Sequence, residues 1–202
     1  LGEPAIETTA LAILAHYLRE FGLHGEAVEL LLQSIDRVRG MGLMSVSTPF
    51  AASNLAETYV ETGDLDEAER WVAEGLSLSP SPKLRVFLES EAMQAAMLKG
   101  DMERARAAAA RVPPLGPHPQ KQLHIVQLAI AAQVELMRRE GRLREAVETA
   151  MDVLRSTDLE VGPGYGWQYL DISAALLQQA AGASAAWADP LPELRARIVE
   201  AA

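Results

Sequence analysis

The stretch NLAETYVETGDLDEAERWVAEGLSLSP, residues 54–80, carries the strongest structural signal in the sequence. Apolar residues recur at helical spacing on both sides of Gly63-Asp64, and Ser79-Pro80 ends the second apolar run. Glycine suits the end of a helix because it adopts the left-handed backbone conformation without a Cβ clash, and an aspartate after it can cap the next helix. The stretch therefore predicts a pair of helices, over residues 49–61 and 65–78.

The same turn signal recurs along the whole chain. The turn glycines, spaced by 41, 37, 41 and 41 residues, are Gly22, Gly63, Gly100, Gly141 and Gly182. Five residues after each of the first four comes an alanine, at Ala27, Ala68, Ala105 and Ala146, whereas Trp187 follows the fifth. A small side chain there lets two helices approach closely. The pattern predicts five helical hairpins, over approximately residues 4–39, 49–78, 83–112, 119–156 and 166–201.

Composition agrees with an all-helical chain. Of 202 residues, 49% are hydrophobic but only 5% are aromatic, which disfavours sheets that need bulky side chains on a pleated surface. The absence of cysteine excludes disulfide frameworks and thiolate metal sites. A net charge of -10 is the wrong sign for binding nucleic acid phosphates or an anionic membrane. We expect an all-α fold, an α-solenoid of about five antiparallel hairpins forming a single domain over residues 1–202.

No catalytic motif accompanies this pattern. The sequence lacks a phosphate-binding GxxxxGK loop, an HExxH zinc motif and a GxSxG nucleophile motif. Residues 162–166 contain three glycines, but no strand is predicted before them, so an inter-helix loop is favoured over a phosphate cradle. His16, His24, His118 and His124 are scattered, and surface or packing roles are favoured over metal ligation. We expect no enzymatic activity, no cofactor and no metal.

Two further clusters have plain structural interpretations. Arginines in residues 138–144 are interleaved with Glu135, Glu140 and Glu145, and Arg104, Arg106 and Arg111 lie on another predicted helix; a solvated helical face with local ion pairs is favoured over a phosphate-binding patch. The large side chains Trp71, Trp167, Trp187, Tyr59, Met93, Met97 and Met102 could line a hydrophobic pocket. Packing between hairpins is the favoured interpretation.

The hairpin of residues 54–80 resembles the tetratricopeptide repeat. The residues that carry this resemblance are Ala52, Leu55, Ala56, Tyr59, Gly63, Asp64, Ala68, Leu76 and Pro80. The spacing exceeds the 34 residues of that repeat. With residues 22–31, 54–69 and 164–167, the whole chain resembles the tetratricopeptide-like region of LuxR-type, ATP-dependent bacterial transcription activators, the maltose-regulator family. The resemblance implies a cytoplasmic segment between an ATPase module and a helix-turn-helix domain, which senses an effector or a partner protein.

The resemblance also implies a binding face. In a tetratricopeptide superhelix the first helix of each hairpin lines a concave groove. The groove positions by this alignment are His16, Arg19, Phe50, Asn54, Glu57, Phe87, Ser90, Glu91, Gln94, Glu135, Arg138, Tyr169 and Ser173. Their mixed chemistry suits a peptide, a partner helix or a small polar effector, although each residue taken singly could be an ordinary surface position. The array lacks the paired lysines and asparagines that clamp a terminal carboxylate in some tetratricopeptide proteins.

Two functions remain open at this point. The first is a non-catalytic sensor module that couples recognition in the groove to the parent protein's activity. The alternative is a protein-protein scaffold without a small-molecule effector. A helical enzyme with carboxylates clustered in the groove has no motif in its favour. The sequence begins at Leu1 and contains no apolar run of the roughly 18 residues that span a bilayer, so we expect a cytoplasmic fragment without membrane or direct nucleic acid binding. Terminal hairpins could pair between copies, because their outer faces are otherwise uncovered.

Overall fold

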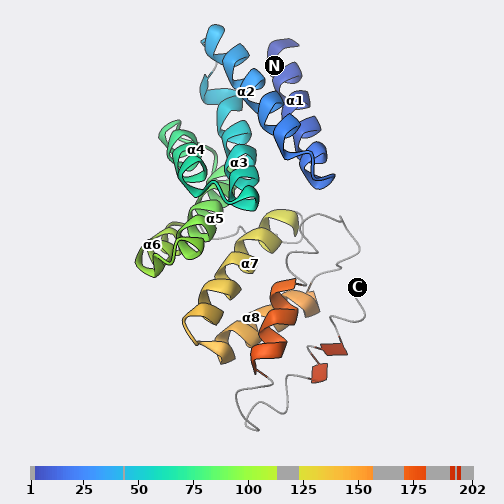
Figure 1. Cartoon of the computed structure of the whole chain (residues 1–202), viewed down its shortest axis with the longest axis vertical. Helices are drawn as coiled ribbons and strands as arrows, with labels where there is room; N and C mark the ends of the chain where they lie inside the picture. Colours follow the sequence, from blue (N-terminus) through green and yellow to red (C-terminus); the bar gives the residue numbers. More distant parts are fainter. Residues whose placement is uncertain are drawn as a thin grey trace. The chain divides into compact units, whose positions relative to one another are not determined.

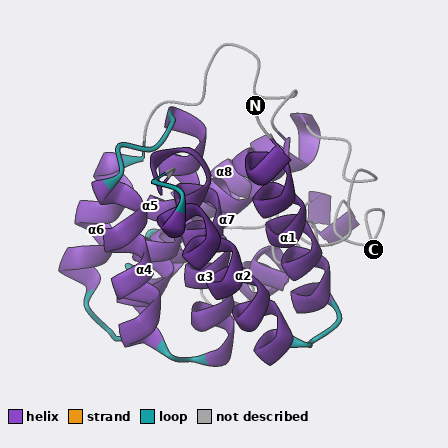
Figure 2. Cartoon of the chain, turned by 90° about the horizontal axis from the view of Figure 1, so that it is seen from above, coloured by secondary structure: helices purple, strands orange, loops and turns teal. Residues whose placement is uncertain are grey.

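The structure is a computed structural model of the whole chain, and it describes residues 3–42, 44–112, 123–156, 171–180, 192–193 and 195–196. The secondary structure within these ranges is helical, with turns and short loops between the helices (Figure 2). The predicted all-α class is therefore confirmed for the described part of the chain. The chain divides into two compact units, Leu1–Pro113 and Pro114–Ala202.

The first unit contains six helices in the described residues, which follow one another as three hairpins (Figure 1). They are α1 (Glu3–Glu20), α2 (His24–Gly40), α3 (Met44–Thr62), α4 (Leu65–Ser77), α5 (Pro82–Leu98) and α6 (Met102–Arg111). Each helix packs against the next one, and the first helices of successive hairpins also pack together, α1 against α3 and α3 against α5. The three first helices therefore form a continuous row.

The turns inside the hairpins use the predicted glycines. Gly22, Gly63 and Gly100 all have φ between 76° and 83°, the left-handed region that glycine enters without strain. Asp101 caps α6, because its side chain accepts a hydrogen bond from the backbone N–H of Arg104 at 3.0 Å. Asp64 makes no such bond to α4. One of the two expected aspartate caps is thus present.

Small side chains bring the two helices of a hairpin together. The alanines five residues after the turn glycines, including Ala27 and Ala68, are completely buried. Around them Leu31, Leu55 and Trp71 belong to one apolar core that is shared by the first two hairpins. Burial of such side chains supplies most of the stability of a helical unit, since short helices are marginal on their own.

The second unit repeats the hairpin. Helices α7 (Leu123–Arg139) and α8 (Leu143–Ser156) pack together across a turn at Gly141, where φ is 76°. Residues 171–180 form a further helix. Its Leu176 and Ala180 share a core with Val134, Val147 and other residues of α7 and α8. This unit is thus built on the same turn and the same small-residue packing.

The helix boundaries differ from the prediction mainly at α3. This helix begins at Met44 rather than at residue 49, so the expected loop over residues 40–48 is shorter. Pro49 therefore lies inside α3 rather than at its start, next to the buried Thr48. Proline is favoured in the first turn of a helix, so its local preference did not determine where this helix begins.

Several predictions fall on other parts of the sequence. The turn at Gly182, Trp187 and most of the fifth hairpin lie outside the described residues, as do the loops over residues 113–119 and 159–166. The single domain over residues 1–202 stays a prediction.

Candidate functional site

A buried charged cluster connects the first helices of the first unit, and Arg19 is its centre. Arg19 lies three residues before the turn glycine of its hairpin and is 4% exposed. Its Nη1 atom lies 2.6 Å from Oε1 of Glu57 and 2.6 Å from Oε1 of Glu61, both on α3. Its Nη2 atom lies 2.9 Å from Oε1 of Glu20 and 3.1 Å from Nδ1 of His16. One guanidinium therefore joins two carboxylates of the next hairpin to two neighbours on its own helix.

Glu91 of α5 adds a buried carboxyl group. The residue is 1% exposed, and neither of its side-chain oxygens makes a hydrogen bond with the part of the chain that the structure describes. Burial raises the pKa of Glu91 well above the usual value, and repulsion from Glu57 raises it further. Burial without a partner thus favours the neutral form of this carboxyl group.

The other groups of the cluster respond to the same environment. Burial raises the pKa of Glu57 to about 7, against the opposing effect of Arg19. Burial also raises the pKa of Glu61. Oε2 of Glu61 lies 3.7 Å from Nδ1 of His24. Burial and then the positive charge of Arg19 lower the pKa of His16. The cluster therefore contains a carboxyl group, that of Glu57, which changes charge near neutral pH, and this is unusual for glutamate.

The remaining predicted residues of the first unit lie on the same helices but are mostly buried. The Asn54 side chain donates a hydrogen bond to the backbone oxygen of Phe50 at 2.9 Å, and the Ser90 hydroxyl donates to that of Val86 at 2.8 Å. Phe50 is half-buried against the apolar core. Phe87 is buried and Gln94 is half-buried. Asn54 and Ser90 are thus engaged by their own helices, whereas His16 and Gln94 are partly accessible.

In the second unit Glu135 and Arg138 form a simpler pair. Arg138 Nε lies 2.7 Å from Oε2 of Glu135, and Arg138 Nη1 donates to Oε1 of Gln179 at 2.8 Å. Arg139 also binds Glu135, at 2.6 Å. Burial acts to raise the pKa of Glu135, but the hydrogen bonds from Arg138 and Arg139 outweigh it and the pKa is lowered. This pair is an ordinary charged pair with access to water.

Two predicted residues complete the set. Ser173 is buried in the second unit, and its hydroxyl oxygen makes no hydrogen bond with the described residues. Tyr169 lies outside the described residues. The structure therefore brings together His16, Arg19, Glu57 and Glu91 in the first unit, and Glu135 with Arg138 in the second.

Glu20, Glu61 and His24 are members of the cluster that the sequence pattern did not indicate. Glu61 lies one helical turn after Glu57, so the spacing of four residues was a signal that both carboxylates share one face of α3. Glu20 follows Arg19 directly, and only the side-chain conformation of Arg19 brings them together. His24 starts the second helix of its hairpin, for which no groove position was assigned.

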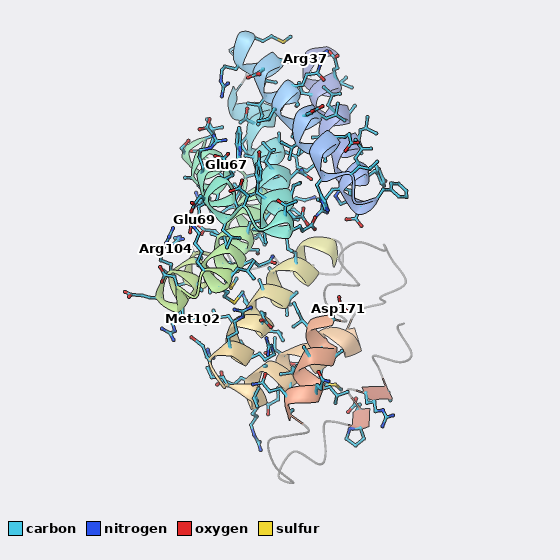
Figure 3. All side chains as sticks on the ribbon, viewed as in Figure 1. Arg37, Glu67, Glu69, Met102, Arg104 and Asp171 are labelled. Carbon is cyan, nitrogen blue, oxygen red and sulfur yellow. The ribbon has the colours of Figure 1, made fainter. Side chains whose placement is uncertain are left out.

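At the surface, other ion pairs connect neighbouring hairpins. Glu69 of α4 binds Lys99 at 2.9 Å and Arg104 of α6 at 2.9 Å. Figure 3 labels Glu69 and Arg104 on their two helices. Exposed pairs of this kind add about 1 kcal/mol or less. Arg104 and Arg111 of α6 thus pair with glutamates of other helices, Glu69 on α4 and Glu89 on α5.

Among the described residues, no three His, Cys, Asp or Glu side chains are placed so that they could hold a metal ion. None of the described helices combines the length and the apolar character needed to cross a membrane. Comparison of the sequence with protein-family models and with curated proteins gives no match.

Proposed function

We propose that this chain is a non-catalytic binding module, a tetratricopeptide-like α-solenoid that recognises a protein, a peptide or a small polar effector on the face formed by the first helices of its hairpins. The observation that carries the proposal is the row of α1, α3 and α5 with the charged cluster of Arg19, Glu57 and Glu91 spanning all three. A row of helices from successive hairpins is the usual binding surface of helical repeat proteins.

The cluster offers a way to couple binding to a change in the module. Arg19 joins the first hairpin to the second through Glu57 and Glu61, so a ligand that binds near these groups would alter the contacts between hairpins. Small changes of angle between repeats add up along a solenoid. By its resemblance to LuxR-type bacterial regulators, the chain would be the sensor segment of such a protein and would pass this change to the parent's other modules.

A ligand screen with a matched pair of variants tests the proposal. Gln94 is half-buried on α5, and Glu103 is exposed on α6. The full chain is screened by thermal shift against metabolites and by affinity capture against a bacterial lysate. A ligand of the first-helix face should lose its effect in Gln94→Ala and keep it in Glu103→Ala. If no metabolite and no protein binds, or if both variants bind equally, this face is not the binding site.

The scaffold alternative is favoured by a different observation. Exposed large apolar side chains in the described residues concentrate on α1 and the turn after it, where Ile13, Tyr17 and Phe21 are accessible. Apolar patches of this kind are typical of protein-protein contacts. Captured proteins without any metabolite-induced thermal shift would support the scaffold and leave the sensor role without a ligand.

A further inference from the structure

The outer face of α1 is the largest concentration of uncovered apolar side chains in the described part of the chain. Tyr17 is 58% exposed and Phe21 is 79% exposed. With Ile6, Ala10, Ile13 and Leu14, which are also exposed, they form one stripe along α1 and Phe21, the turn residue that follows it, at spacings of three and four residues. We call these six residues the α1 stripe. Outside α1 and the adjoining Phe21 and Leu23, the large apolar residues that are exposed in the described ranges are Met41 and Leu98.

The middle of the equivalent face is buried in the other first helices of this unit, whereas the equivalents of Phe21, Thr62 and Lys99, are exposed. Counted from the turn glycine, the positions of Ala10, Ile13 and Tyr17 correspond to Ala51, Asn54 and Thr58 in α3 and to Leu88, Glu91 and Ala95 in α5. All six equivalents are buried. The preceding hairpin covers this side of the row, since α1 and α2 pack against α3, and α3 and α4 pack against α5. The middle of the α1 stripe therefore occupies the positions at which the other first helices of this unit are covered by neighbouring helices.

The stripe is complementary to itself. From the midpoint between Ile13 and Leu14, the spacing of its residues reads the same in both directions. If a second copy of α1 packs antiparallel around a two-fold axis at this midpoint, Ile13 faces Leu14 and Ile6 faces Phe21. The small Ala10 then faces the bulky Tyr17, which is the alternation of small and large side chains that lets two helices interlock.

The charges beside the stripe permit this pairing. In the antiparallel arrangement Glu7 of one copy comes near Glu20 of the other, and two bare carboxylates would repel each other. Each is already paired within its own copy, Glu7 with Arg37 of α2 and Glu20 with Arg19 at 2.9 Å. Figure 3 labels Arg37 on α2. The approach of two copies therefore does not require two unpaired negative charges to meet.

We propose that two copies of this chain associate through their α1 helices, antiparallel and around a two-fold axis, with the α1 stripe as the interface. Such a contact is closed, since the same patch of both copies is used up and no further copies can add. The partner is a second copy because the stripe supplies both sides of its own fit.

The first test is sedimentation equilibrium of the full chain over a wide range of concentration. The chain should show a monomer-dimer equilibrium, and Leu14→Glu should raise the dissociation constant by roughly tenfold or more, as expected for a residue at the centre of an apolar contact. Leu98→Glu, which changes an equally exposed leucine on α5, should leave the constant unchanged. A monomer at every concentration, or a dimer that Leu14→Glu does not weaken, overturns the proposal.

The second test determines the direction of the helices, and the absence of cysteine from the chain makes it clean. Ile6→Cys and Phe21→Cys proteins of different mass are mixed and oxidised. Antiparallel pairing places the two cysteines of different copies together, so mixed disulfides should dominate. Two copies of Ile6→Cys would have their cysteines about 22 Å apart, and should not cross-link. If Ile6→Cys links mainly to itself, the helices are parallel and the proposed interface is wrong. A captured protein that binds the stripe while the chain itself stays monomeric also overturns it.

Discussion

Arg19 and Arg138 occupy the same place in their repeats, three residues before the turn glycine, yet the two units surround them differently. Arg19 is buried and meets carboxylates of its own helix and of the next hairpin. Arg138 is half-exposed and meets one glutamate on its own helix and an amide, Gln179, on the next. The two arginines therefore have the same position relative to the turn glycine, but the burial and the partners of each one determine how much it contributes to stability.

The two arginines differ in their access to water, which decides how much their ion pairs contribute to stability. A surface ion pair gains little, because water screens the charges and two long side chains must be ordered. A buried charge must be matched by its partners, and removal of one partner leaves the others uncompensated. In the first unit Glu57 and Glu61 both pair with Arg19, whose positive charge opposes the effect of burial on their pKa values.

The largest expected effect is therefore the loss of Arg19. Arg19→Ala should lower the free energy of unfolding of the first unit by about 3–5 kcal/mol, because it leaves buried carboxylates without their cation. Arg138→Ala should cost the second unit about 1 kcal/mol or less. Denaturant unfolding of the full chain is followed by the fluorescence of Trp71, which is buried in the first unit, after Trp167 and Trp187 have been replaced by Phe.

Two controls test whether burial of the arginine is the cause of the larger loss. Arg39→Ala removes an exposed arginine of the first unit that pairs with Asp36, and it should change the Trp71 transition little. Circular dichroism confirms that the variants are folded before denaturant is added. Equal losses for Arg19→Ala and Arg39→Ala would show that burial does not decide the cost.

The sequence predicted the fold of the first unit well because local signals and tertiary packing agree there. Gly63 has the left-handed conformation that a glycine between two apolar runs predicts, and Ala68 has the close packing that its small size allows. At Pro49 the two disagree. Local chemistry favours proline in the first turn of a helix, whereas Pro49 lies inside α3, next to the buried Thr48.

The candidate site was predictable only in part. The alignment of hairpins found Arg19, Glu57 and Glu91, because a repeat places equivalent residues on one row of helices. It gave no burial, so Ser90 and Asn54 were expected on a face for binding, whereas their side chains bond to their own helices. Side-chain direction and the cover given by neighbouring hairpins are tertiary properties that a single sequence does not state.

The next largest expected effect is a difference between the two units in how their free energy of unfolding depends on pH. Glu91 has a raised pKa when folded, so above about pH 4.5 its carboxyl group keeps a proton that the unfolded chain releases. The stability that it contributes is complete at lower pH and is lost as the pH rises towards the folded pKa. Each such group changes the free energy of unfolding by about 1.4 kcal/mol per pH unit. Glu57, with a pKa of about 7, contributes in the same direction between about pH 4.5 and 7.

Glu91→Gln measures this directly, because glutamine keeps the shape and cannot lose a proton. Unfolding of the first unit, followed by Trp71 between pH 5 and 8, should become less dependent on pH by up to about 1.4 kcal/mol per unit. Glu135→Gln is the matched variant in the second unit. The pKa of Glu135 is lowered, so its contribution is present above pH 4.5 and is lost as the pH falls. Its substitution should leave the Trp71 transition unchanged, and an equal flattening in both variants would contradict the assignment.

The smallest expected effect concerns the turn glycines, which both units share. Gly63 and Gly141 have φ of 83° and 76°, and a Cβ at either position would meet no atom within 4 Å. Gly63→Ala and Gly141→Ala should each cost about 1–2 kcal/mol, from backbone strain alone. Gly25→Ala, in an open position inside α2, should cost nothing or stabilise slightly. Hydrogen exchange of the full chain, resolved by peptide, reports each unit separately. Similar losses at Gly63 and Gly141 would mean that the turn is energetically equivalent in both units, which leaves the charged cluster around Arg19 as the feature that sets the first unit apart.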